Sequence, residues 1–273
     1  MKTIIPEGTK IICDGMISTD TTELVIPTSV REIRDEAFAN CELLRTVVIP
    51  EGVGEIGDRV FWGCSSLQEV ILPKGLKKIG ANAFYKCISL NNIVIPSEVE
   101  EIGVGAFCYC ASLESIVIPS GITEIEHSVF GGCYTLKSIV IPEGVKRLRP
   151  FAFDNCSSLQ TVVLPEGLTE IGEHAFNECY SLKAVILPEG ITEIGEYAFY
   201  ACSSLRSIVI PEGITKINMC TFRGCTSLKT VILPEGITNI DRNAFLGCIQ
   251  LNRMVIPGTP EIAVGAFYGC TLL

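Results

Sequence analysis

The sequence predicts a solenoid of stacked, β-rich turns, because one structural unit recurs along nearly the whole chain. Proline recurs every 23 residues from Pro27 to Pro257. Phenylalanine and cysteine recur with the same interval, starting at Phe38 and Cys41. Three coincident periods over about ten copies indicate a repeat architecture, in which each unit buries its apolar residues against its neighbours.

The copy at 44–66 shows the elements expected in each turn. Its opening LRTVVIP is rich in β-branched residues, which predicts a short strand over 44–49. Pro50 has no N–H to donate to a ladder, so the strand ends there. Glu51 and Gly52 then form a turn.

The second half of the copy returns to the interior. The spacing of residues 60–64, which read Ala-Phe-x-x-Cys in most copies, suits one helical turn. Stacked copies would share one interior, because a 23-residue unit cannot bury its apolar residues alone. In the reference copy these residues are Leu44, Val47, Ile49, Val53, Ile56, Val60, Phe61 and Cys64. Parallel strands about 4.8 Å apart predict a stack on the order of 50 Å long.

Composition and charge exclude several classes of protein. Hydrophobic residues make up 48% of the chain and charged residues 19%, which excludes a disordered chain. The net charge of -10 disfavours nucleic acid and anionic membranes. No apolar run reaches the ~18 residues of a membrane helix, and Pro-Glu-Gly at 6–8 interrupts the apolar core that a signal peptide needs. We therefore expect no nucleic-acid partner, no membrane insertion and, for the chain as given, a cytoplasmic location.

The repeat resembles the leucine-rich repeats, and closely their BspA-like branch. The pattern L-x-x-I-x-I-P-x-x-[VIL]-x-x-I-G-x-x-A-F-x-x-C-x-x is matched over 21–273, for example by LKTVILPEGITNIDRNAFLGCIQ at 228–250. The resemblance implies a leucine-rich repeat solenoid of the α/β horseshoe class, right-handed, with a parallel β-sheet on the concave face and short helical turns on the convex side. We expect one solenoid over 1–273, with a degenerate N-terminal capping turn at 1–20 and about eleven repeats at 21–273.

The same resemblance implies a function and a second possible location. It is typical of bacterial proteins that adhere to surfaces or bind host proteins, and it favours the cell surface or secretion. A protein-binding scaffold or adhesin module that engages a protein partner through the concave sheet is therefore the expected function.

Eleven of the fourteen cysteines occupy one position per copy. Neighbours in such a column have parallel side chains one strand spacing apart, which is poor geometry for a disulfide. Ligands along a line do not converge on a metal. We expect a buried ladder of reduced thiols, with no metal and no cofactor; a disulfide set and a metal site are the alternatives.

Catalytic motifs are not found in the sequence. His127 and His174 precede the phenylalanine of their copies and are expected to be surface loop residues. Nucleophile-elbow, phosphate-loop and H-E-x-x-H patterns do not occur. We expect no catalytic residues and no enzymatic activity.

One apolar column points away from the predicted core, because it lies between the two inward residues of each strand. Its members form a predicted binding surface: Val48, Ile71, Val94, Val117, Val140, Val163, Ile186, Val209 and Ile232, with Val25 and Val255 at its ends. Sheet propensity is the alternative explanation.

Charged columns lie on either side of this apolar column in the second half of the chain. After the strand come Glu143, Glu166, Glu189, Glu212 and Glu235, and before it come Lys137, Lys183, Arg206 and Lys229. A bound cation or a solvated acidic edge would each account for the glutamates.

Trp62, Tyr85 and Tyr109 cluster in neighbouring copies, on the expected convex side. They support an alternative function, carbohydrate or surface-polymer binding; scattered surface aromatics are the simpler interpretation.

The C-terminal end departs from the repeat, because Pro257 to Phe267 is one residue short and the chain stops at Leu273 without a polar capping unit. The strand around residue 255 would keep an unpaired edge, so weak self-association through that edge is expected.

Overall fold

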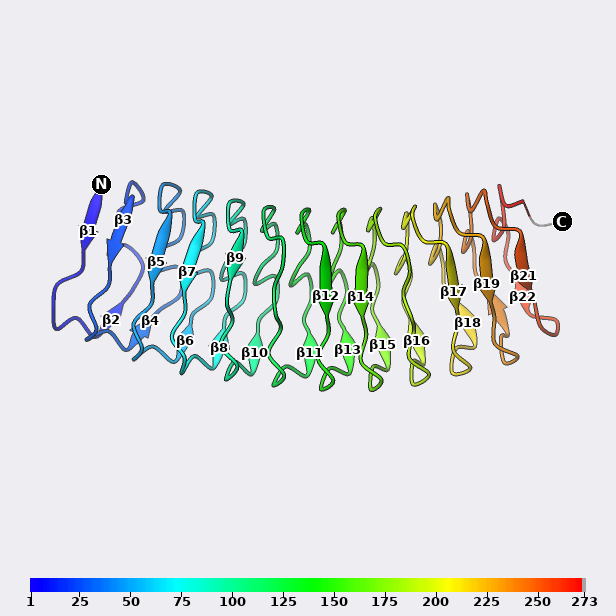
Figure 1. The fold of residues 1–273 in the computed structure, drawn as a ribbon, viewed down its shortest axis with the longest axis horizontal. Helices are drawn as coiled ribbons and strands as arrows, with labels where there is room; N and C mark the ends of the chain where they lie inside the picture. Colours follow the sequence, from blue (N-terminus) through cyan, green and yellow to red (C-terminus); the bar gives the residue numbers. More distant parts are fainter. Residues whose placement is uncertain (272–273) are drawn as a thin grey trace. The chain divides into compact units, whose positions relative to one another are not determined.

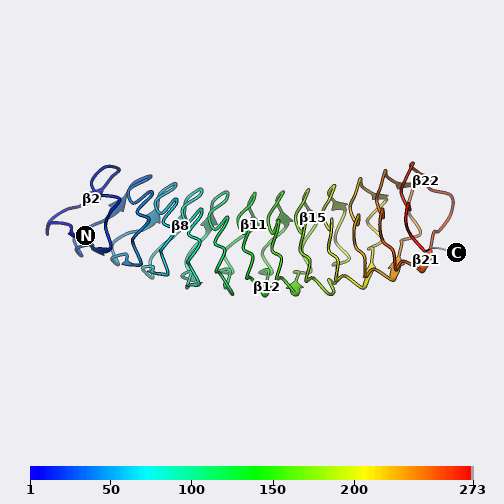
Figure 2. The same cartoon turned by 90° about the horizontal axis from the view of Figure 1, so that it is seen from above.

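Each copy of the repeat folds into one turn of a stack, and most turns contribute two short strands (Figure 1). The computed structural model describes residues 1–271. The chain divides into two compact units: unit 1 comprises Met1–Ile122 and Ser128–Leu136, and unit 2 comprises Thr123–His127 and Lys137–Leu273. Within each unit the turns follow one another in chain order, as Figure 2 shows from above.

The first strand of a turn lies in a first row. In unit 1 this row contains β1 (Lys2–Ile4), β3 (Glu23–Val25), β5 (Thr46–Val48), β7 (Glu69–Ile71) and β9 (Asn92–Ile93). In unit 2 it contains β12 (Ser138–Val140), β14 (Thr161–Val163), β17 (Ser207–Val209), β19 (Thr230–Ile232) and β21 (Arg253–Val255). The turn between β14 and β17 joins the row only through a bridge from Thr161 to Ala184.

The second strand of a turn lies in a second row. In unit 1 its strands are β2 (Ile11–Ile12), β4 (Glu32–Ile33), β6 (Glu55–Ile56), β8 (Lys78–Ile79) and β10 (Glu101–Ile102). In unit 2 they are β11 (Glu124–Ile125), β13 (Arg147–Leu148), β15 (Glu170–Ile171), β16 (Glu193–Ile194), β18 (Lys216–Ile217), β20 (Asn239–Ile240) and β22 (Glu261–Ile262).

The strands pair in parallel with their equivalents in the next copy. Thr46 of β5 lies opposite Glu69 of β7, and Ser207 of β17 lies opposite Thr230 of β19. Because this offset equals the sequence period, equivalent side chains lie beside one another. The predicted stack of parallel-strand turns is confirmed.

The interior is the one expected from the repeat. All eight residues assigned to the core in the reference copy are buried, and none is more than 2% exposed. The phenylalanine rings stack on their neighbours, with centroids 5.2 Å apart for Phe61 and Phe84 and 5.4 Å apart for Phe176 and Phe199. Each turn is therefore stabilised mainly by contact with the turns next to it.

The expected helical turn at 60–64 is wrong, since residues 1–271 contain no helix. Positive φ angles of 54° at Arg59 and 74° at Gly63 interrupt any helical run. In addition, the N–H of Phe61 donates to the carbonyl of Ala83 in the next copy at 2.8 Å, so it is not available for a helical hydrogen bond. Residues 60–64 instead form tight turns that are hydrogen-bonded to the equivalent residues of the next copy. In this part of the chain no helix is therefore long and apolar enough to span a membrane.

The cysteine column is buried beside the phenylalanines. The Cys64 thiol donates to the carbonyl of Phe38 at 3.1 Å, and Cys202 donates to Phe176 at 3.2 Å. All fourteen cysteines are free thiols in this structure. Burial raises the pKa of the Cys87 thiol well above its usual range.

The turn at each end of the chain pairs with the turn beside it. Residues 1–20 form a turn whose strands β1 and β2 pair with β3 and β4. In the last turn, β21 and β22 pair with β19 and β20. Among the described residues β21 and β22 each have one partner strand, and Met254 and Ile256 in the last turn are partly exposed. The expected chain end at Leu273 lies outside the described residues.

Candidate binding surface

The apolar column lies on the outer face of the first strand row. In each three-residue strand of β12, β14, β17 and β19 the middle residue is buried and the last residue is exposed. Ile139, for example, is 2% exposed, whereas the adjacent Val140 is 62% exposed. The exposed members are Val25, Val48, Ile71, Val94, Val117, Val140, Val163, Ile186, Val209, Ile232 and Val255. The strand alternation thus brings every residue of the predicted surface to the outside of its unit.

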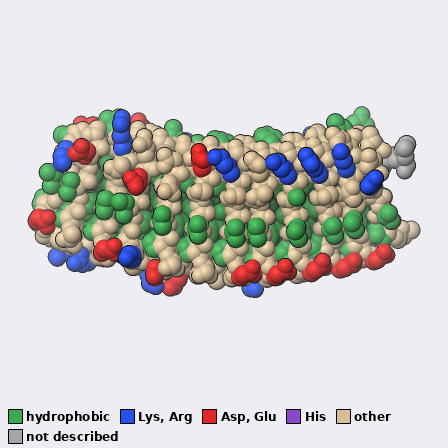
Figure 3. All heavy atoms as spheres, viewed as in Figure 1, with side chains coloured by type: hydrophobic (Ala, Val, Ile, Leu, Met, Phe, Trp, Pro, Cys, Tyr) green, Lys and Arg blue, Asp and Glu red, His purple; other side chains and the backbone are tan. Residues whose placement is uncertain are grey.

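In unit 2 this column is bordered by opposite charges. Figure 3 shows hydrophobic side chains along this face, with acidic side chains on one side and basic side chains on the other. Glu143, Glu166, Glu189, Glu212 and Glu235 are all exposed, as are Lys137, Lys183, Arg206 and Lys229.

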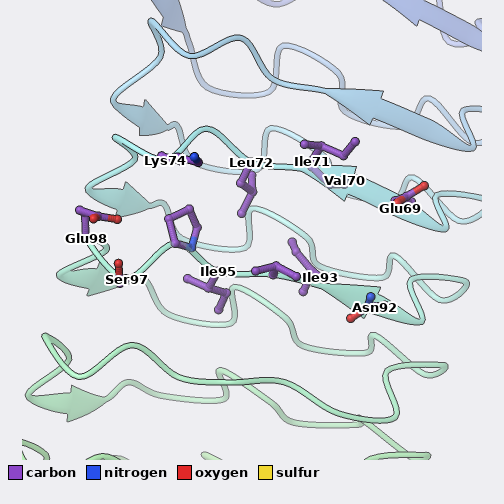
Figure 4. A pocket seen from close by; sticks show the side chains of 12 residues that line it. Glu69, Val70, Ile71, Leu72, Lys74, Asn92, Ile93, Ile95, Ser97 and Glu98 are labelled. Carbon is purple, nitrogen blue, oxygen red and sulfur yellow. The ribbon is translucent and has the colours of Figure 1, made fainter.

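Grooves open between neighbouring turns of the first row. β7 and β9 pair through Val70 and Ile93, and the pairing stops there. A groove of about 520 Å³ follows, lined by the Ile71 and Val94 turns together with Lys74 and Glu98 (Figure 4). In unit 2 a second groove of about 390 Å³ lies between the turns of Val163 and Ile186. Such depressions can receive side chains of a bound partner, and the sequence contains no direct signal for them.

The predicted aromatic cluster is real and larger than expected. The rings of Trp62 and Tyr85 stack with centroids 6.1 Å apart, and Tyr85 meets Tyr109 edge-on at 5.7 Å. Tyr134, which the sequence analysis missed, extends the cluster at 6.5 Å from Tyr109. The Lys86 ammonium lies 5.5 Å from the centroid of the Tyr85 ring. These contacts cover part of the ring faces on which a sugar would have to stack.

His174 is only partly exposed. Its ring lies between those of Phe151 and Tyr197, with both centroids 4.6 Å away and the planes nearly parallel. Its Nε2 atom is 3.4 Å from Glu173, while Nδ1 is buried and has no hydrogen-bond partner. His127 packs against Phe151 at 5.2 Å. Both histidines lie in turns as expected, and the sequence did not indicate the stacking of His174, which arises because residues one copy apart lie directly beside one another.

Across residues 1–271, no three His, Cys, Asp or Glu side chains are placed to hold a metal ion. The exposed face of the first row therefore offers apolar contact area and, in unit 2, a pattern of opposite charges.

Comparison with known proteins agrees with this architecture. The family described as "BspA type Leucine rich repeat region (6 copies)" matches residues 9–137, 124–220 and 146–273. No curated protein is significantly similar in sequence. The matched family and structures are described as leucine-rich repeat proteins and not as enzymes.

Solved structures of bacterial leucine-rich repeat proteins are also similar. One from Bacteroides ovatus is 30% identical over 99% of this chain and 85% of that chain, with a TM-score of 0.79. A leucine rich cell surface protein from Faecalibacterium prausnitzii is 35% identical over 75% of this chain, with a TM-score of 0.53; the chain spans 64% of that protein. A leucine-rich repeat protein of T. pallidum is 37% identical over 56% of this chain and 72% of that chain, with a TM-score of 0.53.

Proposed function

Because the chain belongs to the BspA-type leucine-rich repeat family, we propose that it is an adhesin-type scaffold that binds a protein partner at the cell surface. The binding surface is the outer face of the first strand row. The observation that carries the proposal is the column of exposed Val and Ile side chains, one in every copy. The likeness to a leucine rich cell surface protein supports the proposed location.

Sheet propensity alone does not require this column to be apolar. Thr favours strands as Val and Ile do, and it would present a hydroxyl group to water. Within unit 2 alone, the six members from Val140 to Val255 are all exposed, and adjoining exposed apolar side chains of this kind often mark interaction sites. The side chains are covered neither by their own unit nor by one another, as Ile186 at 86% exposure illustrates. A protein partner would bury them and gain the hydrophobic free energy of that burial.

Site-specific photo-crosslinking tests the proposal. A benzophenone amino acid is placed at Ile186 or Val209 in the first row, or at the exposed Glu193 in the second row as the matched control. Each purified chain is irradiated with the surface proteins of cultured epithelial cells. We expect protein crosslinks from the first-row positions, suppressed by excess unmodified chain, and none from Glu193. Equal labelling from both rows, or none from the first row, would contradict the proposal.

Carbohydrate or surface-polymer binding is the second candidate, supported by the cluster of Trp62, Tyr85, Tyr109 and Tyr134. Binding of immobilised polysaccharides is compared for the wild type, Trp62→Ala and Val209→Lys. Loss on Trp62→Ala, with binding retained by Val209→Lys, would favour this function. The covered ring faces make it the weaker candidate.

A further inference from the structure

Five consecutive turns of unit 2 carry three parallel columns on one face (Figure 3). The apolar column consists of Val140, Val163, Ile186, Val209 and Ile232. The acidic column consists of Glu143, Glu166, Glu189, Glu212 and Glu235, and the basic column consists of Lys137, Lys183, Arg206 and Lys229, with Gln160 filling the remaining place. Apart from Gln160, a charged residue lies three positions before each apolar residue, just ahead of the strand, and a glutamate lies three positions after it, in the turn that follows the strand.

The charges on this face have few partners within the chain. None of the five glutamates has a Lys, Arg or His nitrogen within ion-pair distance among the described residues. Arg206 and Lys229 likewise make no ion pair in this part of the chain, and Lys183 donates to Gln160 at 3.0 Å. Elsewhere on the chain some acids and bases do pair with each other, as Lys78 does with Glu101 and Lys216 with Asp241.

This pattern is complementary to itself under one symmetry operation. Consider a second copy facing the first, related by a two-fold axis that runs parallel to the columns. The rotation leaves the apolar columns facing each other and exchanges the two sides, so each basic column faces an acidic column. A two-fold axis across the columns would instead place base over base and acid over acid, which is repulsive.

We propose that this face of unit 2 binds a second copy of the chain, face to face, with the two-fold axis parallel to the columns. The proposal rests on the proposed use of this face for binding and names its partner. In the aligned register Lys183 lies opposite Glu189 of the second copy, Arg206 opposite Glu212, and Lys229 opposite Glu235. Two sheets packed about 10 Å apart leave room for these long side chains to meet.

The size of the face predicts a weak dimer. Five turns about 4.8 Å apart and about 20 Å wide give about 500 Å² per copy. A total of about 1,000 Å² lies at the low end of specific interfaces. The dimer is therefore concentration-dependent, and salt weakens it because its charged rims stay near solvent. Unit 1 lacks the pattern, since Gln68, Asn91, Ser97 and Ser120 occupy the equivalent places.

The proposal is tested by exchanging the charges of the two columns and measuring dimerisation by sedimentation. The chain concentration runs over roughly 1–500 μM, a range chosen for a weak interface of this size. Variant A carries Lys183→Glu, Arg206→Glu and Lys229→Glu, so both of its rims are acidic. Variant B carries Glu189→Lys, Glu212→Lys and Glu235→Lys, so both of its rims are basic. We expect each variant alone to lose at least tenfold in dimer affinity. An equimolar mixture of A and B should dimerise again, as should one chain carrying all six substitutions, because opposite charges then face each other on both rims.

The matched control is Glu193→Lys, Glu196→Lys and Glu261→Lys, which makes the same charge change as variant B at exposed positions off this face. It should dimerise like the wild type, and circular dichroism melting verifies that every variant is folded.

A monomeric wild type, or dimerisation of A and B at wild-type affinity, overturns the inference. Failure of the mixture to associate overturns the proposed orientation and with it the inference. If first-row crosslinks to epithelial proteins persist in such a case, the proposed function stands and only the second copy as partner is rejected.

Discussion

Replacing Phe176 with Ala should reveal how strongly each turn depends on its neighbours. The side chain is fully buried, and its ring stacks on Phe153 at 5.5 Å and on Phe199 at 5.4 Å. Truncating a core phenylalanine costs about 3–5 kcal/mol, and stacked aromatic pairs add about 0.5–1.5 kcal/mol each beyond buried area. With both ring faces occupied, we expect a loss near the top of the range, about 4–5 kcal/mol.

Phe267 provides the matched comparison at the end of the stack. It is partly exposed and stacks on Phe245 at 5.3 Å, so Phe267→Ala should cost about half as much, roughly 2 kcal/mol. Urea unfolding followed by circular dichroism measures both variants. Hydrogen exchange then shows whether protection is lost in the copies on both sides of Phe176, as nearest-neighbour coupling requires. Equal costs for the two variants, or a loss below about 1.5 kcal/mol for Phe176→Ala, would refute the reasoning.

Five further predictions follow from the same structure. Deleting the whole copy 182–204 should leave a folded, shorter stack by circular dichroism, whereas deleting 182–193 should unfold unit 2; equal tolerance would contradict the repeat packing. At pH 8 iodoacetamide should modify Cys270 before the buried column, because its hydrogen bond with Cys248 lowers the Cys270 pKa, while burial raises the pKa of column thiols such as Cys64, Cys87 and Cys179. The unfolding free energy should also fall as pH rises above about 9, since the unfolded thiols then ionise and the folded ones stay protonated. Replacing the exposed Val117, Val140 and Val163 by lysine should leave the melting temperature nearly unchanged and abolish the protein crosslinks. A large loss of stability would show that these side chains are needed within the fold. We also propose weak self-association through the edge of β21 that is unpaired among the described residues, reduced by a polar capping turn appended to the C-terminus and retained by variant A; a strictly monomeric variant A in sedimentation would exclude it.

The sequence determined the architecture because its period is the period of the structure. Once Pro50, Phe61 and Cys64 are equivalent to residues 23 positions away, neighbouring turns must place like beside like. Strand alternation then assigns Val47 to the core and Val48 to the outer face without any knowledge of the tertiary fold. The apolar column and its charged borders were predictable for the same reason.

The tertiary structure decided what depends on contact between copies. The Ala-Phe-x-x-Cys segment has a spacing that fits a helix, yet the N–H groups of Phe61 and Gly63 donate to the next turn, and left-handed residues such as Arg59 prevent helical winding. The position of His174 between two rings and the grooves beside Ile71 and Ile186 likewise depend on how closely neighbouring turns approach. The sequence pattern shows which residues are equivalent. The distance and angle at which equivalent residues meet depend on the folded chain, because backbone hydrogen bonds between turns set how the turns are placed.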